Sequence, residues 1–225
     1  TDITRVTIHE GITKLPNYVF DGCDKLVEAN YSSFVTTIGD YAFRGTALRS
    51  VYVDKRVTKI GDGAFENCAL LTELTFNQTG SDRLTIGIDA FRTDPIKELV
   101  LPLRIYTTGV TGRVLHGVDK YCFADNPELR TVRFGNEGNV SAYARLTLGE
   151  GAFRNCTSLE SVEFPSTFGN ATVNTSGGPY SSTYYPFGAY SFADCTSLRE
   201  VKLNVPENAT YSTFDLSGSA TITTA

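Results

Sequence analysis

The chain lacks long apolar runs and basic runs. No stretch of its 225 residues approaches the roughly 18 apolar residues that a membrane-spanning helix needs. Its 20 Lys and Arg residues are outnumbered by 25 Asp and Glu residues, which gives a formal charge of −5. Nucleic-acid-binding surfaces have the opposite charge balance. We therefore expect neither nucleic acid as a partner nor membrane insertion within this segment.

Residue patterns that carry catalysis are also missing. The sequence has only two histidines: His9 stands beside Glu10 after a predicted strand, and His116 stands in a predicted loop near Asp119. It contains no HExxH or CxxC spacing for a metal, no P-loop and no GxSxG nucleophile turn. We therefore predict that the protein is not an enzyme and has no catalytic residues, no metal and no cofactor.

Cysteine occurs in an odd number, five, which does not fit a disulfide framework. Four of the five share one position, three residues after a phenylalanine: Cys23, Cys68, Cys156 and Cys195. The same position is taken elsewhere by Thr46, Asp94 and Asn126, so it favours a small buried group and not a thiol as such. Only Cys156 and Cys195 fall in consecutive repeats. A bridge between them is disfavoured because in-register neighbours rarely reach the required torsion.

The chain is organised around a repeated motif, clearest in residues 60–76, IGDGAFENCALLTELTF. Its phenylalanine recurs at steps of 23, 22, 26, 32, 30 and 39 residues, at Phe20, Phe43, Phe65, Phe91, Phe123, Phe153 and Phe192. A period near 22 residues with insertions is typical of leucine-rich and related solenoids. These phenylalanines, with the four cysteines of the shared position, are the predicted repeat core.

Each repeat ends in two apolar residues separated by one, the spacing of a half-buried strand. The residues between the two should face solvent: Thr7, Asn30, Tyr52, Thr75, Val100, Arg133, Glu163 and Lys202. We predict a right-handed, β-rich, leucine-rich-repeat-like solenoid with a parallel sheet on one face and short 3₁₀ or irregular turns on the other. It should form one unit over residues 3–203 with about eight strands, and residues 204–225 should be a C-terminal cap or a truncated repeat.

Glycine recurs just before the Ala-Phe pair, at Gly39, Gly61, Gly87, Gly149 and Gly188. Glycine allows either a positive φ or a close approach of stacked backbones. The sequence leaves both explanations open.

Insertions lengthen the later repeats, always between the strand and this glycine, within residues 77–84, 102–117, 135–147 and 165–186. Insertions at one phase of a solenoid emerge along one edge, often a binding face. The insertions carry several tyrosines, which give contact area at low entropy cost. With two residues of the strand face they are the predicted ligand-binding set: Tyr52, Tyr106, Arg133, Tyr143, Tyr180, Tyr184 and Tyr185. The alternative is that the insertions are solvated loops that grew because loop closure costs little per added residue.

A second surface feature is a stripe of acidic residues that precede the strand pairs: Glu28, Glu73, Glu98 and Glu200. It would attract a basic partner. The simpler interpretation is a solvated face that keeps the sheet soluble and discourages edge pairing.

Three segments carry a resemblance to a known family: IGDYAFRGTALRSVYV (38–53), IGDGAFENCALLTELTF (60–76) and LGEGAFRNCTSLESVEFP (148–165). They resemble the BspA-type leucine-rich repeats of bacterial surface proteins, also called the Treponema pallidum type. The resemblance covers about residues 3–203 and is weakest at residues 94–96 and at Cys122. It implies a secreted or cell-surface protein with an adhesive or protein-binding role, and it brings no catalytic residues with it.

The leading hypothesis is a module that binds an extracellular protein by adhesion. A carbohydrate ligand is the alternative, because exposed tyrosine beside Asn or Asp can hold a sugar. The third hypothesis is a structural spacer that displays another domain. The chain starts TDITRVTIHE, without a Met or a signal-like segment, so we expect a mature piece or a segment of a longer protein.

Overall fold

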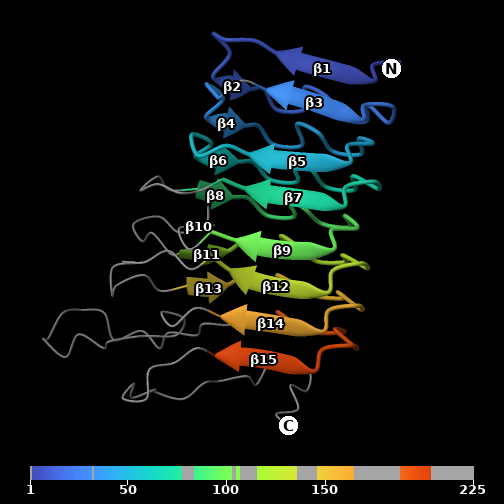
Figure 1. Cartoon of the computed structure of the whole chain (residues 1–225), viewed down its shortest axis with the longest axis vertical. Helices are drawn as coiled ribbons and strands as arrows, with labels where there is room; N and C mark the ends of the chain where they lie inside the picture. Colours follow the sequence, from blue (N-terminus) through green and yellow to red (C-terminus); the bar gives the residue numbers. More distant parts are fainter. Residues whose placement is uncertain are drawn as a thin grey trace, which may run out of the picture.

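The computed structural model describes residues 2–31, 33–77, 84–102, 105–106, 116–135, 146–164 and 188–203. Within these ranges it contains fifteen strands and no helix. The strands stack along one long axis, with β1 at the end where the chain begins (Figure 1). The predicted fold class, a β-rich solenoid of the leucine-rich-repeat kind, is confirmed. We number its coils one to seven by their repeat phenylalanines, from Phe20 to Phe192.

Eight four-residue strands form one row along the molecule (Figure 1): β1 (Arg5–Ile8), β3 (Glu28–Tyr31), β5 (Ser50–Val53), β7 (Glu73–Phe76), β9 (Glu98–Leu101), β12 (Thr131–Phe134), β14 (Ser161–Phe164) and β15 (Glu200–Leu203). Their pairs are parallel and in register: β1 with β3, β5 with β7, and β9 with β12, β14 and β15 in turn. Exposed and buried residues alternate along β5 and β9. The predicted period of two is therefore confirmed.

The structure adds a second sheet of short strands that the sequence did not reveal. It contains β2 (Lys14–Leu15), β4 (Thr37–Ile38), β6 (Lys59–Ile60), β8 (Leu84–Ile86), β10 (Ile105–Tyr106), β11 (His116–Val118) and β13 (Leu146–Leu148). Neighbours in this sheet pair in parallel, except that β10 meets β11 in antiparallel fashion through Tyr106 and His116. The core lies between this sheet and the row of long strands.

A stack of phenylalanine rings runs through the core. Successive repeat phenylalanines lie nearly parallel, with ring centroids 5.2–5.6 Å apart. From Phe43 to Phe192 these side chains are almost completely buried, and Phe20 in the first coil is partly buried. Buried aromatic pairs of this kind contribute about 0.5–1.5 kcal/mol beyond the burial of their area. The ring stack therefore helps to hold successive coils together along the core.

The segment around each repeat phenylalanine forms irregular turns that bond to the next coil. The N–H groups of Tyr18, Phe20 and Gly22 donate to carbonyls of the second coil at 2.9, 2.8 and 2.8 Å. The intervening N–H group of Asp21 donates back to the Tyr18 carbonyl at 3.3 Å. Tyr18 and Gly22 have left-handed φ values of 60° and 68°. A continuous 3₁₀ helix cannot include such residues, so the turns are of the irregular kind.

The recurring glycine is required for close approach and not for a positive φ. A Cβ atom on Gly61 would lie 2.5 Å from the backbone nitrogen of Asp40, and one on Gly39 would lie 2.6 Å from that of Asn17. Neither glycine has a positive φ. The left-handed backbone comes two residues later, at Tyr41 and Gly63. Of the two explanations that the sequence left open, close approach is correct.

Candidate binding surface on the strand face

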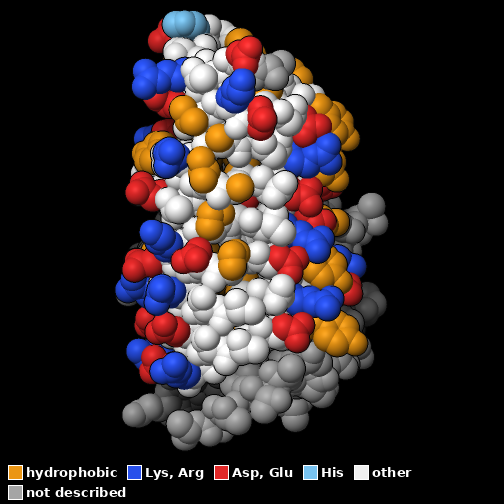
Figure 2. Space-filling view, turned by 90° about the vertical axis from the view of Figure 1, so that its right-hand side faces the viewer, with side chains coloured by type: hydrophobic (Ala, Val, Ile, Leu, Met, Phe, Trp, Pro, Cys, Tyr) orange, Lys and Arg blue, Asp and Glu red, His pale blue; other side chains and the backbone are white. Residues whose placement is uncertain are grey.

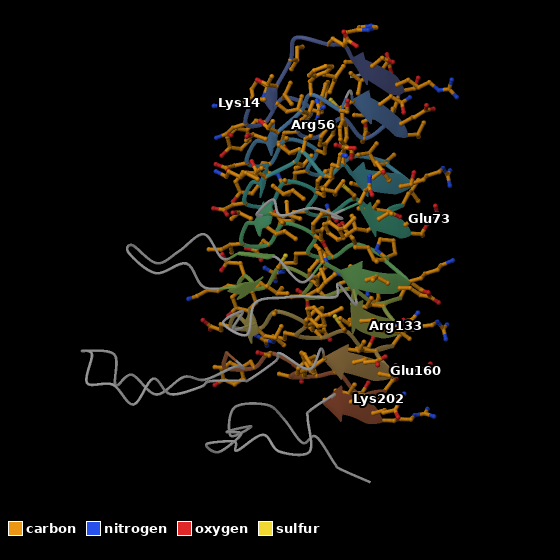
Figure 3. The ribbon with its side chains drawn as sticks, turned by 60° about the vertical axis from the view of Figure 1, so that its left-hand side comes forward. Lys14, Arg56, Glu73, Arg133, Glu160 and Lys202 are labelled. Carbon is orange, nitrogen blue, oxygen red and sulfur yellow. The ribbon has the colours of Figure 1, made fainter. Side chains whose placement is uncertain are left out.

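The residues predicted to face solvent form the outer surface of the long strands. All eight are exposed except Glu163, which is half-buried. Glu73, Arg133, Glu160 and Lys202 project away from the strands on the side opposite Lys14 (Figure 3). The most exposed apolar side chains of the strand row are Tyr52 and Val100, at 53% and 49%. This surface, the strand face, combines apolar and charged groups.

Several charges on and beside the strand face are paired. The guanidinium of Arg5 lies 3.1 Å from the carboxylate of Glu28, and the ammonium of Lys202 lies 3.4 Å from that of Glu200. Arg130 and Glu160 form a looser pair at 3.5 Å. Exposed pairs of this kind add little stability. They neutralise the predicted acidic stripe at two of its four members, so the stripe is not a continuous negative surface.

A shallow groove of about 230 Å³ crosses the strand face at β9, β12, β14 and β15. Its lining is mostly polar and charged, and consists of Glu98, Thr131, Arg133, Ser161, Val162, Glu163, Glu200 and Lys202. The register explains why these side chains converge, because Arg133 stands opposite Glu163 and Glu163 stands opposite Lys202. Alternate residues of neighbouring strands point to the same face.

Two polar groups in this groove have no partner. Within the described ranges Arg133 makes no ion pair, and the hydroxyl oxygen of Thr131 is buried without a hydrogen bond. Buried polar groups are usually bonded, so each exception needs an explanation. The exposed guanidinium of Arg133 can bind a carboxylate of a partner through two parallel hydrogen bonds.

The strand that carries Tyr52 is fixed from inside the core. The hydroxyl of Tyr31, on β3, donates to the backbone carbonyl of Tyr52 at 2.5 Å. Burial, followed by the charge of Asp54, raises the pKa of the Tyr31 hydroxyl. It therefore remains a hydrogen-bond donor at any physiological pH. The outward side chain of Tyr52 is thus presented on a fixed backbone.

The structure brings only part of the predicted ligand-binding set together. Tyr52 and Arg133 share the strand face, but β7 and β9 lie between their strands. Tyr106 belongs to β10 in the short-strand sheet, and its side chain lies outside the described residues. The remaining four also lie outside them: Tyr143, Tyr180, Tyr184 and Tyr185. Their role stays a prediction.

Other residues with interesting geometry were missed at the sequence level. They stand two residues before the repeat phenylalanine, where tyrosine occurs in four of the seven coils: Tyr18, Tyr41, Tyr121 and Tyr190. All four have a left-handed φ, between 50° and 61°. Alignment of the repeats on phenylalanine would have shown this tyrosine column. Tyrosine is not a usual signal for left-handed backbone, so its conformation could not have been foreseen.

The cysteine position has a function that the sequence did not show. The thiols of Cys68, Cys156 and Cys195 each donate to the carbonyl of the repeat phenylalanine in the preceding coil, at 3.2, 3.2 and 3.0 Å. In the fifth coil the side-chain amide of Asn126 makes the same bond at 2.9 Å. All five cysteines are free. In these four coils the position therefore supplies a small donor to the carbonyl of a repeat phenylalanine.

The described ranges contain no cluster of three or more His, Cys, Asp or Glu residues able to hold a metal ion. His9 is exposed, and the side chain of His116 is not among the described residues. The same ranges contain no helix long and apolar enough to cross a membrane.

Comparison with known proteins gives one strong match. A family model described as BspA type leucine rich repeat region matches the chain in six copies, over residues 1–111 and 116–223. The resemblance inferred from the three quoted segments is thereby confirmed. A search of curated proteins finds no match.

Solved structures of bacterial leucine-rich repeat proteins are similar at low identity. A leucine rich cell surface protein from Faecalibacterium prausnitzii is 19% identical with a TM-score of 0.37, covering 91% of this chain and 61% of that one. The pneumococcal vaccine antigen PcpA is 15% identical with a TM-score of 0.42, covering 88% and 67%. A leucine-rich repeat protein from Eubacterium ventriosum is 16% identical with a TM-score of 0.34, covering 89% and 60%. The chain thus spans less than two thirds of the first and third of these proteins.

Proposed function

Because the chain belongs to the BspA-type leucine-rich repeat family, we propose that it is a non-catalytic binding module of a secreted or cell-surface protein. Its partner is a host or matrix protein, bound by adhesion to the strand face. The observation that carries the proposal is the groove over β9, β12, β14 and β15, whose lining includes the guanidinium of Arg133, which makes no ion pair within the described residues. A guanidinium binds carboxylates through two parallel hydrogen bonds, so the partner presents an Asp, a Glu or a chain end there.

The composition of the strand face supports a protein ligand. Tyr52 and Val100 provide exposed apolar area, and Arg133 provides a directional charge. Tyrosine and arginine are enriched among the residues that dominate the energy of protein interfaces. A spacer would have no need for an exposed arginine that makes no ion pair within the described residues and lines a groove. The groove is too shallow and open to be a pocket of the size that encloses a small molecule.

The insertions belong to the same proposal. Each insertion begins after the carboxyl end of a long strand, β7, β9, β12 or β14, and these ends lie along one edge of the row (Figure 1). Their tyrosines, Tyr106, Tyr143, Tyr180, Tyr184 and Tyr185, would extend the strand face along that edge. A variant with residues 177–185 replaced by a Gly-Ser link tests this extension separately from the groove.

The decisive experiment is a binding screen of the whole chain against purified extracellular-matrix proteins, with Arg133→Ala beside it. We expect Arg133→Ala to weaken binding on the order of tenfold or more, as for a hot-spot arginine. The matched control is Lys14→Ala, which removes an exposed cation on the opposite side of the molecule (Figure 3). Equal affinities of the two variants would overturn the groove as the site. Absence of any matrix ligand would favour the spacer hypothesis.

A further inference from the structure

The turns around the repeat phenylalanines form a second surface, away from the strand face. Figure 2 shows the side of the molecule at the amino ends of the long strands, where charged side chains gather in two rows separated by an uncharged strip. One of these two rows is formed by residues of the turns around the repeat phenylalanines. We call this row the turn edge. It contains the tyrosine column and the residues one and two positions after each phenylalanine.

A hollow of about 320 Å³ lies on the turn edge between the fourth and seventh coils. It is lined by six side chains, all polar: Arg92, Tyr121, Asp125, Arg154, Asn155 and Asp194. Successive coils therefore supply a guanidinium, a phenol with a carboxylate, a guanidinium with a carboxamide, and a second carboxylate. Coils one and two lack a polar side chain at the later position, where they have glycine, Gly22 and Gly45.

Most of these groups are held in place before any ligand arrives. Asp125 accepts hydrogen bonds from Arg92 Nε at 2.8 Å and from Asn155 Nδ2 at 2.9 Å. The Tyr121 ring packs on the backbone of Gly151, where a Cβ atom would lie 2.3 Å from the ring. Its hydroxyl donates to Glu150 at 2.8 Å. Preorganised groups of this kind lose little entropy on binding.

One pair of side chains in the hollow is held less firmly. The Arg154 guanidinium lies 3.7 Å from the Asp194 carboxylate, beyond hydrogen-bond distance. Both side chains are more than half exposed, at 52% and 63%. A ligand can therefore enter between them and take hydrogen bonds from one and give them to the other. The hollow thus has fixed partners on one side and adaptable partners on the other.

The polar side chains here exceed what the backbone requires. Asp125, Asn155 and Asp194 have φ values of 57°, 57° and 62°, a conformation that glycine, Asn and Asp tolerate best. Glycine meets the same requirement in coils one and two, where φ is 68° and 67°. The carboxylates and the carboxamide meet the same backbone requirement as glycine and in addition place polar groups in the same hollow as the two arginines.

We propose that this hollow binds a neutral sugar unit of a glycan. Its two guanidinium groups and two carboxylates balance, so no net charge selects an ion. Donors lie beside acceptors in the lining, since Asp125 accepts from Arg92 and Asn155 and the Arg154 guanidinium lies 3.7 Å from Asp194. Adjacent ring hydroxyls match such a lining, because each hydroxyl both donates and accepts. The edge of the Tyr121 ring supplies the apolar contact. This sugar site is independent of the proposed protein-binding groove, which lies on the strand face.

The test uses the whole chain and saturation-transfer NMR with five soluble probes: the methyl glycosides of glucose, galactose, mannose, N-acetylglucosamine and N-acetylgalactosamine, each at up to about 10 mM. The variant is Asn155→Gly, since glycine keeps the left-handed backbone and removes only the carboxamide. The matched control is Asn67→Gly, which makes the same change in the third coil, outside the hollow. Both variants are checked for the native melting transition.

We expect at least one glycoside to bind, Asn155→Gly to weaken it on the order of tenfold, and Asn67→Gly to leave it unchanged. If Asn155→Gly does not fold, Arg154→Ala replaces it, because that side chain is exposed and loosely paired. The proposal is overturned if none of the probes binds, if the two glycine variants behave alike, or if only sulfate or free lysine, added as charged competitors, occupies the hollow. Arg133→Ala should not alter sugar binding, so failure here and failure of the protein-binding proposal are distinguishable.

Discussion

The ring of Tyr41 lies directly on the backbone of Gly63 in the next coil. A Cβ atom on Gly63 would be 2.3 Å from Tyr41 Cε1, and Gly63 also has a left-handed φ of 55°. The same relationship joins Tyr121 to Gly151 three coils later. Where the next coil has tyrosine instead, the two rings stack, as Tyr18 and Tyr41 do at 5.3 Å. The tyrosine column thus packs along the axis in two alternative ways.

This contact predicts a non-additive pair of mutations. Gly63→Ala should lower the free energy of unfolding by about 2–4 kcal/mol, the sum of a left-handed alanine and an overpacked contact. In a Tyr41→Gly background the same change should cost only about 1 kcal/mol, because the ring is gone. Urea unfolding of the four proteins in the cycle measures both values.

Gly45→Ala is the control for that cycle. Gly45 has a similar φ of 67°, but the nearest atom to its Cβ would be 3.9 Å away. It should therefore lose only about 1 kcal/mol, the conformational part alone. Equal losses for Gly45→Ala and Gly63→Ala would contradict the role of the tyrosine ring.

The thiols give a second prediction. Burial raises the pKa of the Cys68 and Cys156 thiols, whereas a hydrogen bond with the Cys156 thiol lowers the pKa of Cys195. Cys195 is also the only one of the five that is not fully buried. Iodoacetamide under native conditions should therefore label Cys195 first, because the exposed thiolate is the reactive species.

Mass spectrometry after limited labelling, followed by proteolysis, identifies the modified residue. All five cysteines should react once the chain is unfolded in urea, since none is in a disulfide. Native labelling of Cys68 at the rate of Cys195 would show that the core opens more readily than its packing indicates. A serine at position 195 should remove the fast phase.

The parts of this fold that repeat strictly could be predicted from the sequence. Phenylalanines such as Phe65 recur with a fixed neighbourhood, and the strand pairs such as Val51 and Val53 alternate with period two, so core and strand face followed directly. The short strands, such as Lys59–Ile60 in β6, are two residues long and have no period to detect. Their pairing depends on the stacking of coils, which only the structure shows.

The candidate sites also differ in whether a repeated pattern in the sequence could reveal them. Arg133 was predicted because its position in the strand pattern fixes its direction. The hollow on the turn edge was missed because it is assembled from four coils, and the conformation of Tyr121 and Asp125 gives no sign in a linear sequence. Insertions of irregular length, such as the one that contains Tyr184, have no repeat against which they can be aligned. The sequence therefore predicts only that they emerge along one edge of the solenoid.

The last prediction concerns Asp94, which occupies the cysteine position in the fourth coil. One carboxylate oxygen accepts a hydrogen bond from the Cys68 N–H group at 2.8 Å, and the other is buried without a partner within the described residues. Asn126, in the next coil, donates at this position to a phenylalanine carbonyl. Ionised Asp cannot donate. Burial raises the pKa of Asp94 well above its usual value, so we expect this acid to be protonated in the native protein.

The sign of the pH dependence follows. In the unfolded chain Asp ionises near its ordinary pKa of about 3.9, so above that pH the native state binds one more proton than the unfolded state. The free energy of unfolding should therefore fall as the pH rises from about 4, by up to about 1.4 kcal/mol per pH unit, until the native pKa is passed.

Asp94→Asn keeps the shape of the side chain, supplies a hydrogen-bond donor and cannot ionise. It should therefore be more stable than the parent protein at pH 7 and should lack this dependence of stability on pH. Urea unfolding at pH 4, 5, 6 and 7 measures both, with the exposed Asp24→Asn as the control. Parallel curves for Asp94→Asn and the parent protein would show that Asp94 is ionised in the native state, and the missing partner of its second oxygen would then have to be a cation or water.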